Sequence, residues 1–256
     1  MRKITIVGAG QGGLQLAMFL LGHDYHVTVV SNRLPGDIAA GRVMSSQSMY
    51  DMAISYEREI GISFWDDECP PIQGVHMRAG NGQPLIDWKS LMAAPGQSVD
   101  QRIKMPRWIE EFQRRGGKME YADVGMAEID GYGAKSDLVV IASGKGEIGG
   151  MFARDAERSA FDQPLRTIAL LYVHGMKQKA DYSALNININ PGVGEYINFP
   201  ALTNSGPCDI INLESIAGGA MDCWAAPKNP AECLELAKAQ IKEFSPGKHH
   251  AARTSV

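Results

Sequence analysis

This 256-residue chain has only four cysteines and six histidines, so it has few residues of the types that usually bind transition metals. The six histidines show no metal-ligand spacing, and no cysteine pair forms a C-x-x-C motif. A disulfide scaffold and a structural zinc site therefore have no support in the sequence. The plain interpretation is a cytoplasmic protein whose thiols are reduced and mostly buried. The cysteines are Cys69, Cys208, Cys223 and Cys233.

Long apolar runs and basic runs are also missing. No segment is long and apolar enough to span a membrane, so we expect a soluble chain that makes no membrane contact. Lys and Arg total 25 against 29 Asp and Glu, which gives a formal net charge of -4. This balance argues against a nucleic-acid surface. The length suggests one large or two small domains with a real hydrophobic core.

Glycine, in contrast, is concentrated at one informative place, Gly8–Gly13. The apolar run 4–7 precedes it, the apolar stretch 14–21 follows it, and a second apolar run comes at 27–30. This order predicts a strand, a G-x-G-x-x-G turn, a helix and a second strand. The first glycine permits the tight turn, the second lets the backbone approach a pyrophosphate, and the third lets the helix lie close to the strand. We therefore predict a dinucleotide-binding unit whose helix N-terminus faces the phosphates.

The end of the second predicted strand leaves the type of dinucleotide open. Such units usually carry Asp or Glu here to accept a hydrogen bond from ribose, but this chain has Ser31, Asn32 and Arg33. Ser31 and Asn32 can still bind a ribose hydroxyl. Arg33 is either a partner for the extra phosphate of NADP or an ordinary solvated arginine.

Residues 1–150 are expected to form the dinucleotide-binding domain, with a short strand insertion near 72–90. A helix should start near Pro106 and end at Gly116. The apolar run 138–142 predicts a buried parallel strand that ends at the carboxyl edge of the sheet, where ligands bind in open α/β folds.

Residues 151–256 show a different pattern, with short alternating segments separated by Pro and Gly. This pattern predicts a mostly antiparallel sheet with one solvated face. The alternating asparagines of 186–190 are interpreted as that polar face. Residues 230–244 should form a helix that Asn229 caps, with an apolar stripe toward the core.

Taken together, these motifs resemble the FAD-dependent epoxidase component of styrene and indole monooxygenases. The resemblance extends from residue 1 to about residue 250, and the run Met44–Gln47 looks closer to the indole branch. The matching stretches are Ile4–Gly13, Val27–Arg33, Gly41–Gln47, Val99–Arg102, Arg115–Lys118, Asp137–Val140, Ser143–Lys145 and Pro191–Glu195.

The resemblance implies an α/β fold, with a Rossmann-like FAD-binding domain of the para-hydroxybenzoate hydroxylase type and a sheet-based substrate-binding domain. It implies FAD, supplied in reduced form by a separate NADH-dependent flavin reductase. It further implies that a flavin C4a-hydroperoxide formed from O₂ transfers oxygen to an aryl alkene of the indole or styrene type. No side chain is expected to act as a catalytic acid or base. The oligomeric state is not fixed, and a homodimer is one expectation.

The resemblance also implies a set of cofactor-binding positions. The glycines hold the pyrophosphate, residues 31–33 lie near the adenosine ribose, and residues 42–45 approach the flavin. Arg102 reaches the phosphate or ribityl region, Val124 lies near the adenine, and residues 142–144 close the pocket. The full set is Gly8, Gly10, Gln11, Gly12, Gly13, Ser31, Asn32, Arg33, Arg42, Val43, Met44, Ser45, Arg102, Val124, Ala142, Ser143 and Gly144.

One departure from the family pattern concerns length. Family chains continue past the last residues here and carry a Gly-Asp motif that binds the ribityl chain, so the sequence suggests a truncated or split product, or a fragment. Two alternatives stay open beside the monooxygenase. One is an NAD(P)-dependent oxidoreductase, favoured by Arg33, and the other is a non-catalytic FAD-binding fragment of the same family.

Overall fold

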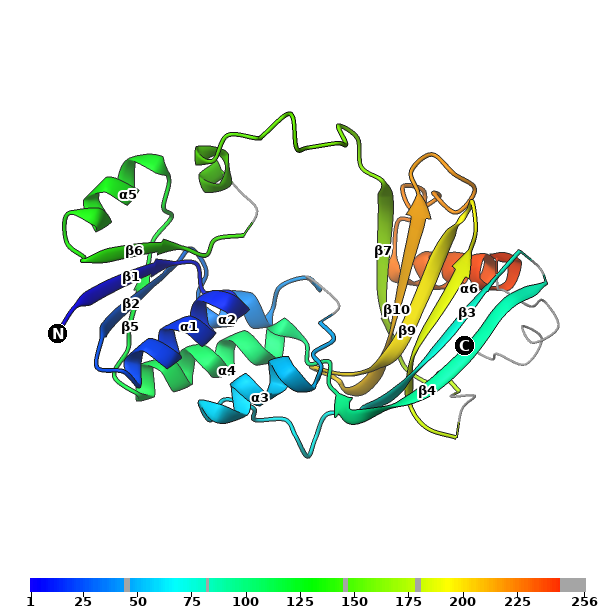
Figure 1. Ribbon diagram of the computed structural model, residues 1–256, viewed down its shortest axis with the longest axis horizontal. Coiled ribbons are helices and arrows are strands. Elements are labelled where there is room, and N and C mark those ends of the chain that lie inside the picture. The colour runs from blue at the N-terminus through cyan, green and yellow to red at the C-terminus, as the bar shows by residue number, and fades with distance from the viewer. Residues whose placement is uncertain (44–46, 82, 145–146, 178–180, 245–256) are drawn as a thin grey trace. The chain divides into compact units, whose positions relative to one another are not determined.

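The computed structural model describes residues 1–43, 47–81, 83–144, 147–177 and 181–244, which form two compact units (Figure 1). The first unit takes its described residues from Met1–Met44, Met52–Phe64 and Asp100–Ser159. The second takes them from Ser45–Asp51, Trp65–Val99 and Ala160–Val256. The chain therefore crosses between the units several times.

The first unit is built on a four-stranded parallel sheet in the order β5-β2-β1-β6. Its strands are β1 (Lys3–Val7), β2 (His26–Ser31), β5 (Lys118–Tyr121) and β6 (Leu138–Ile141). Its helices are α1 (Gln11–Leu21), α2 (Pro35–Ala39), α3 (Asp51–Glu59), α4 (Gln101–Arg114), α5 (Met126–Gly133) and the 3₁₀ helix η1 (Glu147–Met151). The predicted strand–turn–helix–strand order at the N-terminus is confirmed.

Strand β6 is more exposed to solvent than predicted. The apolar run was expected to form a buried strand, but Leu138 is 52% exposed and the rest of β6 is only half-buried. The reason is position. Among the described strands, β6 pairs only with β1 and so forms one edge of the sheet.

Helix α4 begins earlier than predicted. The Asp100 carboxylate accepts a hydrogen bond from the Arg102 backbone N–H at 2.9 Å, so the helix starts at Gln101 and Pro106 lies inside it. The inward stripe is as predicted, because Trp108 and Phe112 are fully buried.

A buried ion pair joins three helices of this unit. Lys104 Nζ on α4 lies 2.5 Å from Glu57 Oε1 on α3, and both side chains are 3% exposed. Gln11 Nε2 at the start of α1 donates to the same Glu57 oxygen at 3.3 Å. The ammonium also lies 4.7 Å from the centre of the Trp108 ring. Each charge is therefore compensated inside the protein.

Removing one partner of this pair should be costly. The substitution Glu57→Gln removes the carboxylate that lies 2.5 Å from the buried Lys104 ammonium, and we expect the free energy of unfolding to fall by about 3–5 kcal/mol. The double variant E57Q/K104M should recover most of the loss, since it buries no unpaired charge. Urea unfolding of both variants tests this, and equal losses in the two would contradict it.

The second unit contains a six-stranded sheet in the order β4-β3-β8-β9-β10-β7. Its elements are β3 (Ile72–Gly80), β4 (Pro84–Gly96), β7 (Arg166–Val173), β8 (Ala184–Asn190), β9 (Gly194–Thr203), β10 (Gly206–Ile216) and helix α6 (Pro230–Phe244). Strand β3 pairs with β8 in parallel, and the other pairs are antiparallel. The strands expected as an insertion near 72–90 therefore belong to this sheet, because β4 is hydrogen-bonded to β3 and β3 to β8.

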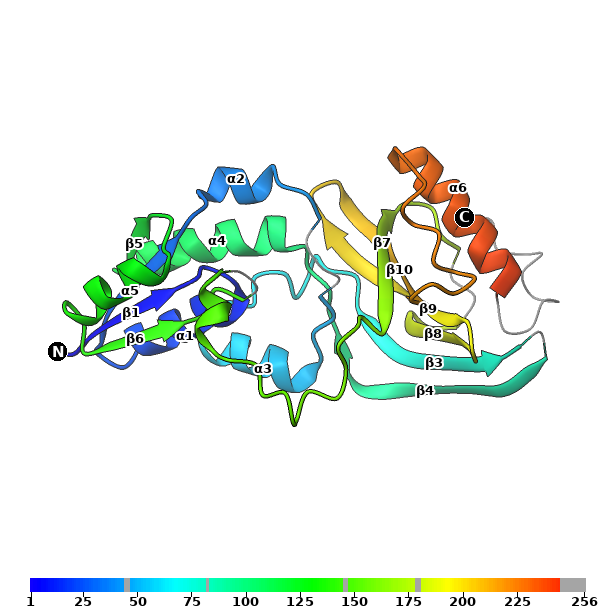
Figure 2. The same cartoon turned by 90° about the horizontal axis from the view of Figure 1, so that it is seen from above.

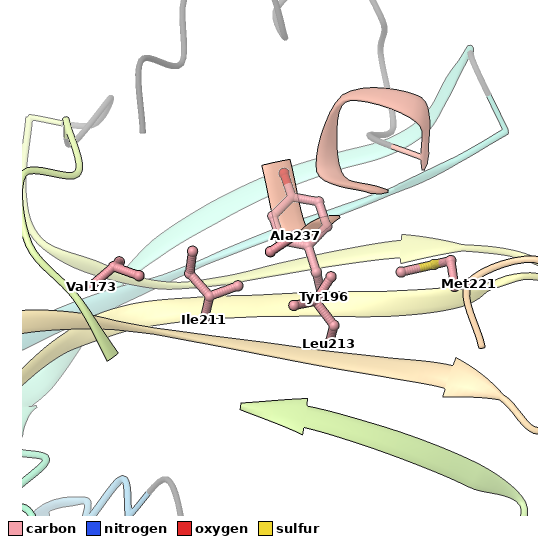
Figure 3. Packing of buried hydrophobic residues seen from close by; sticks show 6 residues of the cluster. All are labelled: Val173, Tyr196, Ile211, Leu213, Met221 and Ala237. Carbon is pink, nitrogen blue, oxygen red and sulfur yellow. The ribbon is translucent and has the colours of Figure 1, made fainter. Parts of the chain in front are cut away.

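Helix α6 has the predicted bounds, and its start is capped as expected by Asn229, whose Oδ1 accepts from the Glu232 N–H at 3.0 Å. Its apolar stripe covers one face of the sheet (Figures 1 and 2). The buried cluster under it is drawn in Figure 3 and consists of Val173, Tyr196, Ile211, Leu213, Met221 and Ala237.

The asparagines of β8 lie on this covered face, so their prediction as a solvated face was wrong. Asn188 is 1% exposed and Asn190 is 9% exposed. Their amide groups donate to backbone carbonyls, Asn188 to Tyr196 at 3.3 Å and Asn190 to Phe244 at 3.1 Å. Burial is possible because the amides bond to the sheet and to the end of α6 in place of water.

The opposite face of the same sheet is apolar and more open. Its buried centre includes Phe199 and Ile210, with Leu170 and Ile197 partly buried beside them. The strand register places Trp88 and Ile168 on this same face, where they are 51% and 63% exposed. Among the described residues of this unit, the only helix, α6, lies on the other face. We call the face that contains Leu170, Ile197, Phe199 and Ile210 the open face.

A half-buried carboxyl near the start of β10 should make stability depend on pH. Burial raises the pKa of Asp209 to about 6 from 3.8, against a smaller opposing effect of nearby His174. A raised pKa in the folded state means that the protonated form is favoured there. The contribution to stability is complete below pH 3.8 and is lost as the pH rises through about 6.

We therefore expect the free energy of unfolding of the native chain, relative to Asp209→Asn, to fall between pH 4 and pH 6. Urea unfolding at several pH values measures this difference. A difference that stays constant over this range would show that Asp209 titrates normally.

Candidate functional site

The turn between β1 and α1 brings three backbone segments into close approach. Gly8 has φ +123°, a conformation that side-chain-bearing residues rarely adopt, and a Cβ there would lie 2.3 Å from the Ala142 carbonyl oxygen. A Cβ on Gly13 would lie 2.1 Å from the Gly8 carbonyl oxygen. These two glycines therefore let α1 start directly against the carboxyl ends of β1 and β6.

Gly10, the second glycine of the motif, faces open space instead. No atom lies within 4 Å of a Cβ placed there. Gly10 is the N-cap of α1, and no side chain caps it, so the helix N-terminus is available to an anion. Gly10 borders a cavity of about 350 Å³, at the lower end of the range for ligand pockets, about 300–1,000 Å³.

The cavity lies within the first unit, at the carboxyl ends of its parallel strands. Its walls come from the ends of β1, β2 and β6 and from the segment that follows β5. The lining residues are Val7, Gly8, Ala9, Gly10, Val30, Ser31, Asn32, Arg33, Ile38, Ala122, Asp123, Val124, Ala142, Ser143, Gly144 and Ile148.

The segment after β2 is ordered by its own side chain. The Ser31 hydroxyl donates to the Arg33 carbonyl at 2.9 Å, and the Arg33 N–H donates to the Ser31 oxygen at 3.2 Å. Ser31 is only 8% exposed, whereas Asn32 and Arg33 are exposed at the cavity. Ser31 therefore shapes this loop, and its two neighbours line the cavity wall.

Nine of the predicted cofactor positions lie together in this cavity, and six described ones do not line it. The nine are Gly8, Gly10, Ser31, Asn32, Arg33, Val124, Ala142, Ser143 and Gly144. The six are Gln11, Gly12, Gly13, Arg42, Val43 and Arg102. Met44 and Ser45 lie outside the described residues.

Three of the six positions have structural explanations. The Gln11 side chain points to Glu57 in the helix interface. Arg102 is held by Asp100, with its Nε 2.9 Å and its Nη2 2.5 Å from the same carboxylate oxygen. Arg42 is exposed and does not line the cavity.

Sequence reasoning missed the segment Ala122–Asp123 of the cavity wall. This segment directly follows β5, which is parallel to β2. The rule that ligands meet the carboxyl ends of parallel strands applies to β5 as much as to β6. The signal was therefore present, but the short β5 was not used to extend the predicted site beyond Val124.

The described residues contain no group of three or more His, Cys, Asp or Glu side chains that could hold a metal ion. None of their helices is both long and apolar enough to cross a membrane.

Comparison with known proteins adds family information to this geometry. Residues 144–251 match the family model described as "Styrene monooxygenase A putative substrate binding domain". Styrene monooxygenase StyA of Pseudomonas fluorescens is 30% identical over 96% of this chain, and StyA of a Pseudomonas species is 30% identical over 97%. The chain is similar to StyA along almost its whole length. It spans 59% of the length of each of these relatives.

Solved structures show that this chain has the fold of flavin-dependent hydroxylases and halogenases. The flavin-dependent brominase Bmp2 matches with a TM-score of 0.68 at 13% identity, covering 99% of this chain and 64% of that one. The flavin-dependent halogenase CmlS matches with a TM-score of 0.65 at 17% identity, covering 95% and 47%. The predicted α/β fold, with a parallel sheet of the kind found in dinucleotide-binding domains, is therefore confirmed.

Two alanine substitutions should show that Gly13 is needed for stability and that Gly10, at the cavity, is not. Gly13→Ala places a methyl group against the Gly8 carbonyl, and we expect it to destabilise the fold by about 1–3 kcal/mol. Gly10→Ala meets no atom and should leave stability nearly unchanged. Thermal unfolding of the two variants checks this difference, and equal stability of both would contradict it.

Proposed function

We propose that this chain is the oxygenating component of a two-component flavin monooxygenase, which adds one oxygen atom from O₂ to an aryl alkene of the indole or styrene type. The cavity at the glycine turn is the observation that carries this proposal. It combines a helix N-terminus, an open glycine and polar groups at the ends of parallel strands, in a chain related to StyA.

The cavity suits the ADP half of FAD. The space at Gly10 is what a pyrophosphate needs for close approach to the backbone, and the N-terminus of α1 favours its negative charge. Asn32 and Arg33 would bind the ribose and phosphate oxygens, and Val124 would contact the adenine. When bound, reduced flavin supplies the activation of O₂ and the oxygen transfer.

The open face of the second unit suits the other partner in the reaction. An aryl alkene is flat and apolar, so it gains free energy from leaving water for a surface such as that of Leu170, Ile197 and Ile210. The role of the chain itself is therefore to hold and orient the substrate, and we assign no side chain as a catalytic acid or base.

A separate NADH-dependent flavin reductase is part of the proposal. Within the described residues, Gly8–Gly13 is the one glycine-rich turn that joins a parallel strand to a helix at the sheet. FAD bound there occupies the place that NADH would need. Reduced FAD would then come from a second protein, in the cytoplasm, where both proteins meet their substrates.

An anaerobic titration of the purified chain with reduced FAD tests the proposal. We expect saturable binding, followed by an oxygenated product when oxygenated buffer and indole or styrene are added. Gly10→Ala should weaken FAD binding by about tenfold, because its methyl group enters the cavity. Gly36→Ala, the same change at an open position in α2 that does not line the cavity, should bind FAD normally.

An NAD(P)-dependent oxidoreductase is the second candidate, favoured by the position of Arg33 at the cavity. The same preparation separates the two. Tight binding of NADPH without binding of FAD would overturn the monooxygenase in favour of this candidate. Binding of FAD without any oxygenated product would instead support a non-catalytic flavin-binding fragment.

A further inference from the structure

One polar residue interrupts the apolar open face. Alternate residues of β10 that face this side are Ile210, Asn212 and Glu214. In register, Asn212 lies directly between Ile197 of β9 and Leu170 of β7. Residues directly opposite one another on a sheet face contact each other, so this amide stands between two aliphatic side chains.

The orientation of the Asn212 amide is set by its neighbour. Its Nδ2 donates to Glu214 Oε1 at 2.6 Å, which leaves Oδ1 as the acceptor on the other side. Asn212 is 8% exposed, and Oδ1 is buried with no hydrogen-bond partner among the described residues. A buried amide carbonyl without a donor is unfavourable, so a ligand that supplies one is favoured at this point.

The bond to Glu214 also strengthens this acceptor. A carboxylate that accepts from the amide nitrogen draws the amide dipole toward itself and makes Oδ1 a better acceptor, because hydrogen bonds in a chain polarise one another. Asn188 has a buried unpartnered Oδ1 as well, but it lies on the other face, under α6. Asn212 is on the face that α6 does not cover.

We propose that Asn212 determines specificity by accepting a hydrogen bond from an N–H donor on the aromatic substrate. The ring packs against Ile197 and Leu170 after these side chains move aside from Oδ1, and the donor satisfies the carbonyl. This inference rests on the proposed function and deepens it, since it selects nitrogen heteroaromatics of the indole class over hydrocarbon alkenes such as styrene. A site built to bond an N–H group rejects an isostere that lacks it.

Ligand binding to the full chain without flavin tests this. Indole and indene have nearly the same shape, and only indole has an N–H group. Ligand-observed NMR titrations should show that indole binds about fivefold to tenfold more tightly than indene. In Asn212→Leu, which keeps the branched shape of the side chain and removes the amide, the two dissociation constants should agree within about twofold.

Asn198→Leu is the matched control, because Asn198 lies on the face that α6 covers, opposite Ile211. It should keep the preference for indole. Thermal unfolding would confirm that both variants are folded.

The outcomes separate this inference from the proposed function. Equal binding of indole and indene to the native chain, or a preference that survives in Asn212→Leu, would overturn the role of Asn212 and leave the open face as the substrate surface. Absence of binding by both compounds would overturn the open face as well. FAD binding at the glycine turn is measured separately and does not depend on either result.

Discussion

The contact between the backbone at Gly8, Gly13 and Ala142 is the constraint on which the first unit depends. It brings the end of β1, the start of α1 and the end of β6 to one point. Because no side chain separates these segments, the N–H groups of the helix start can face the same space as the strand ends. The cavity that we assign to the nucleotide exists because of this close approach.

Charged residues in the first unit serve mainly to hold its helices together. Glu57 and Lys104 connect α3 to α4, and through Gln11 they connect both to the start of α1. Hydrogen bonds from Arg114 lower the pKa of Glu111 to about 2, while Arg115 bonds to Glu111 and to the Ile60 carbonyl. These charges therefore hold the helices of the unit in position.

The second unit uses one residue type in two ways. Asn188 and Asn190 are buried under α6, where their amides donate to backbone carbonyls and join the sheet to the helix. Asn212 lies on the open face with its carbonyl unpartnered among the described residues. The same amide is thus a structural group on one face and a candidate recognition group on the other, and only the position of α6 separates the two.

The sequence by itself determined the local elements. The G-x-G-x-x-G turn, the bounds of α6 with its Asn229 cap, and the inward stripe of α4 follow from glycine geometry, capping and periodicity, which act over a few residues. Nine of the predicted cofactor positions also meet in one cavity, because parallel strands place their carboxyl ends at a common edge.

Long-range pairing decided the rest. The register of β3 with β8 moved the hairpin of 72–90 into the second sheet, and the position of β6 at an edge left Leu138 exposed. An alternating strand shows that its two faces differ but not which of them a helix will cover. Only the packing of α6 on the asparagine face decided which face of the sheet is covered and which apolar face is left open.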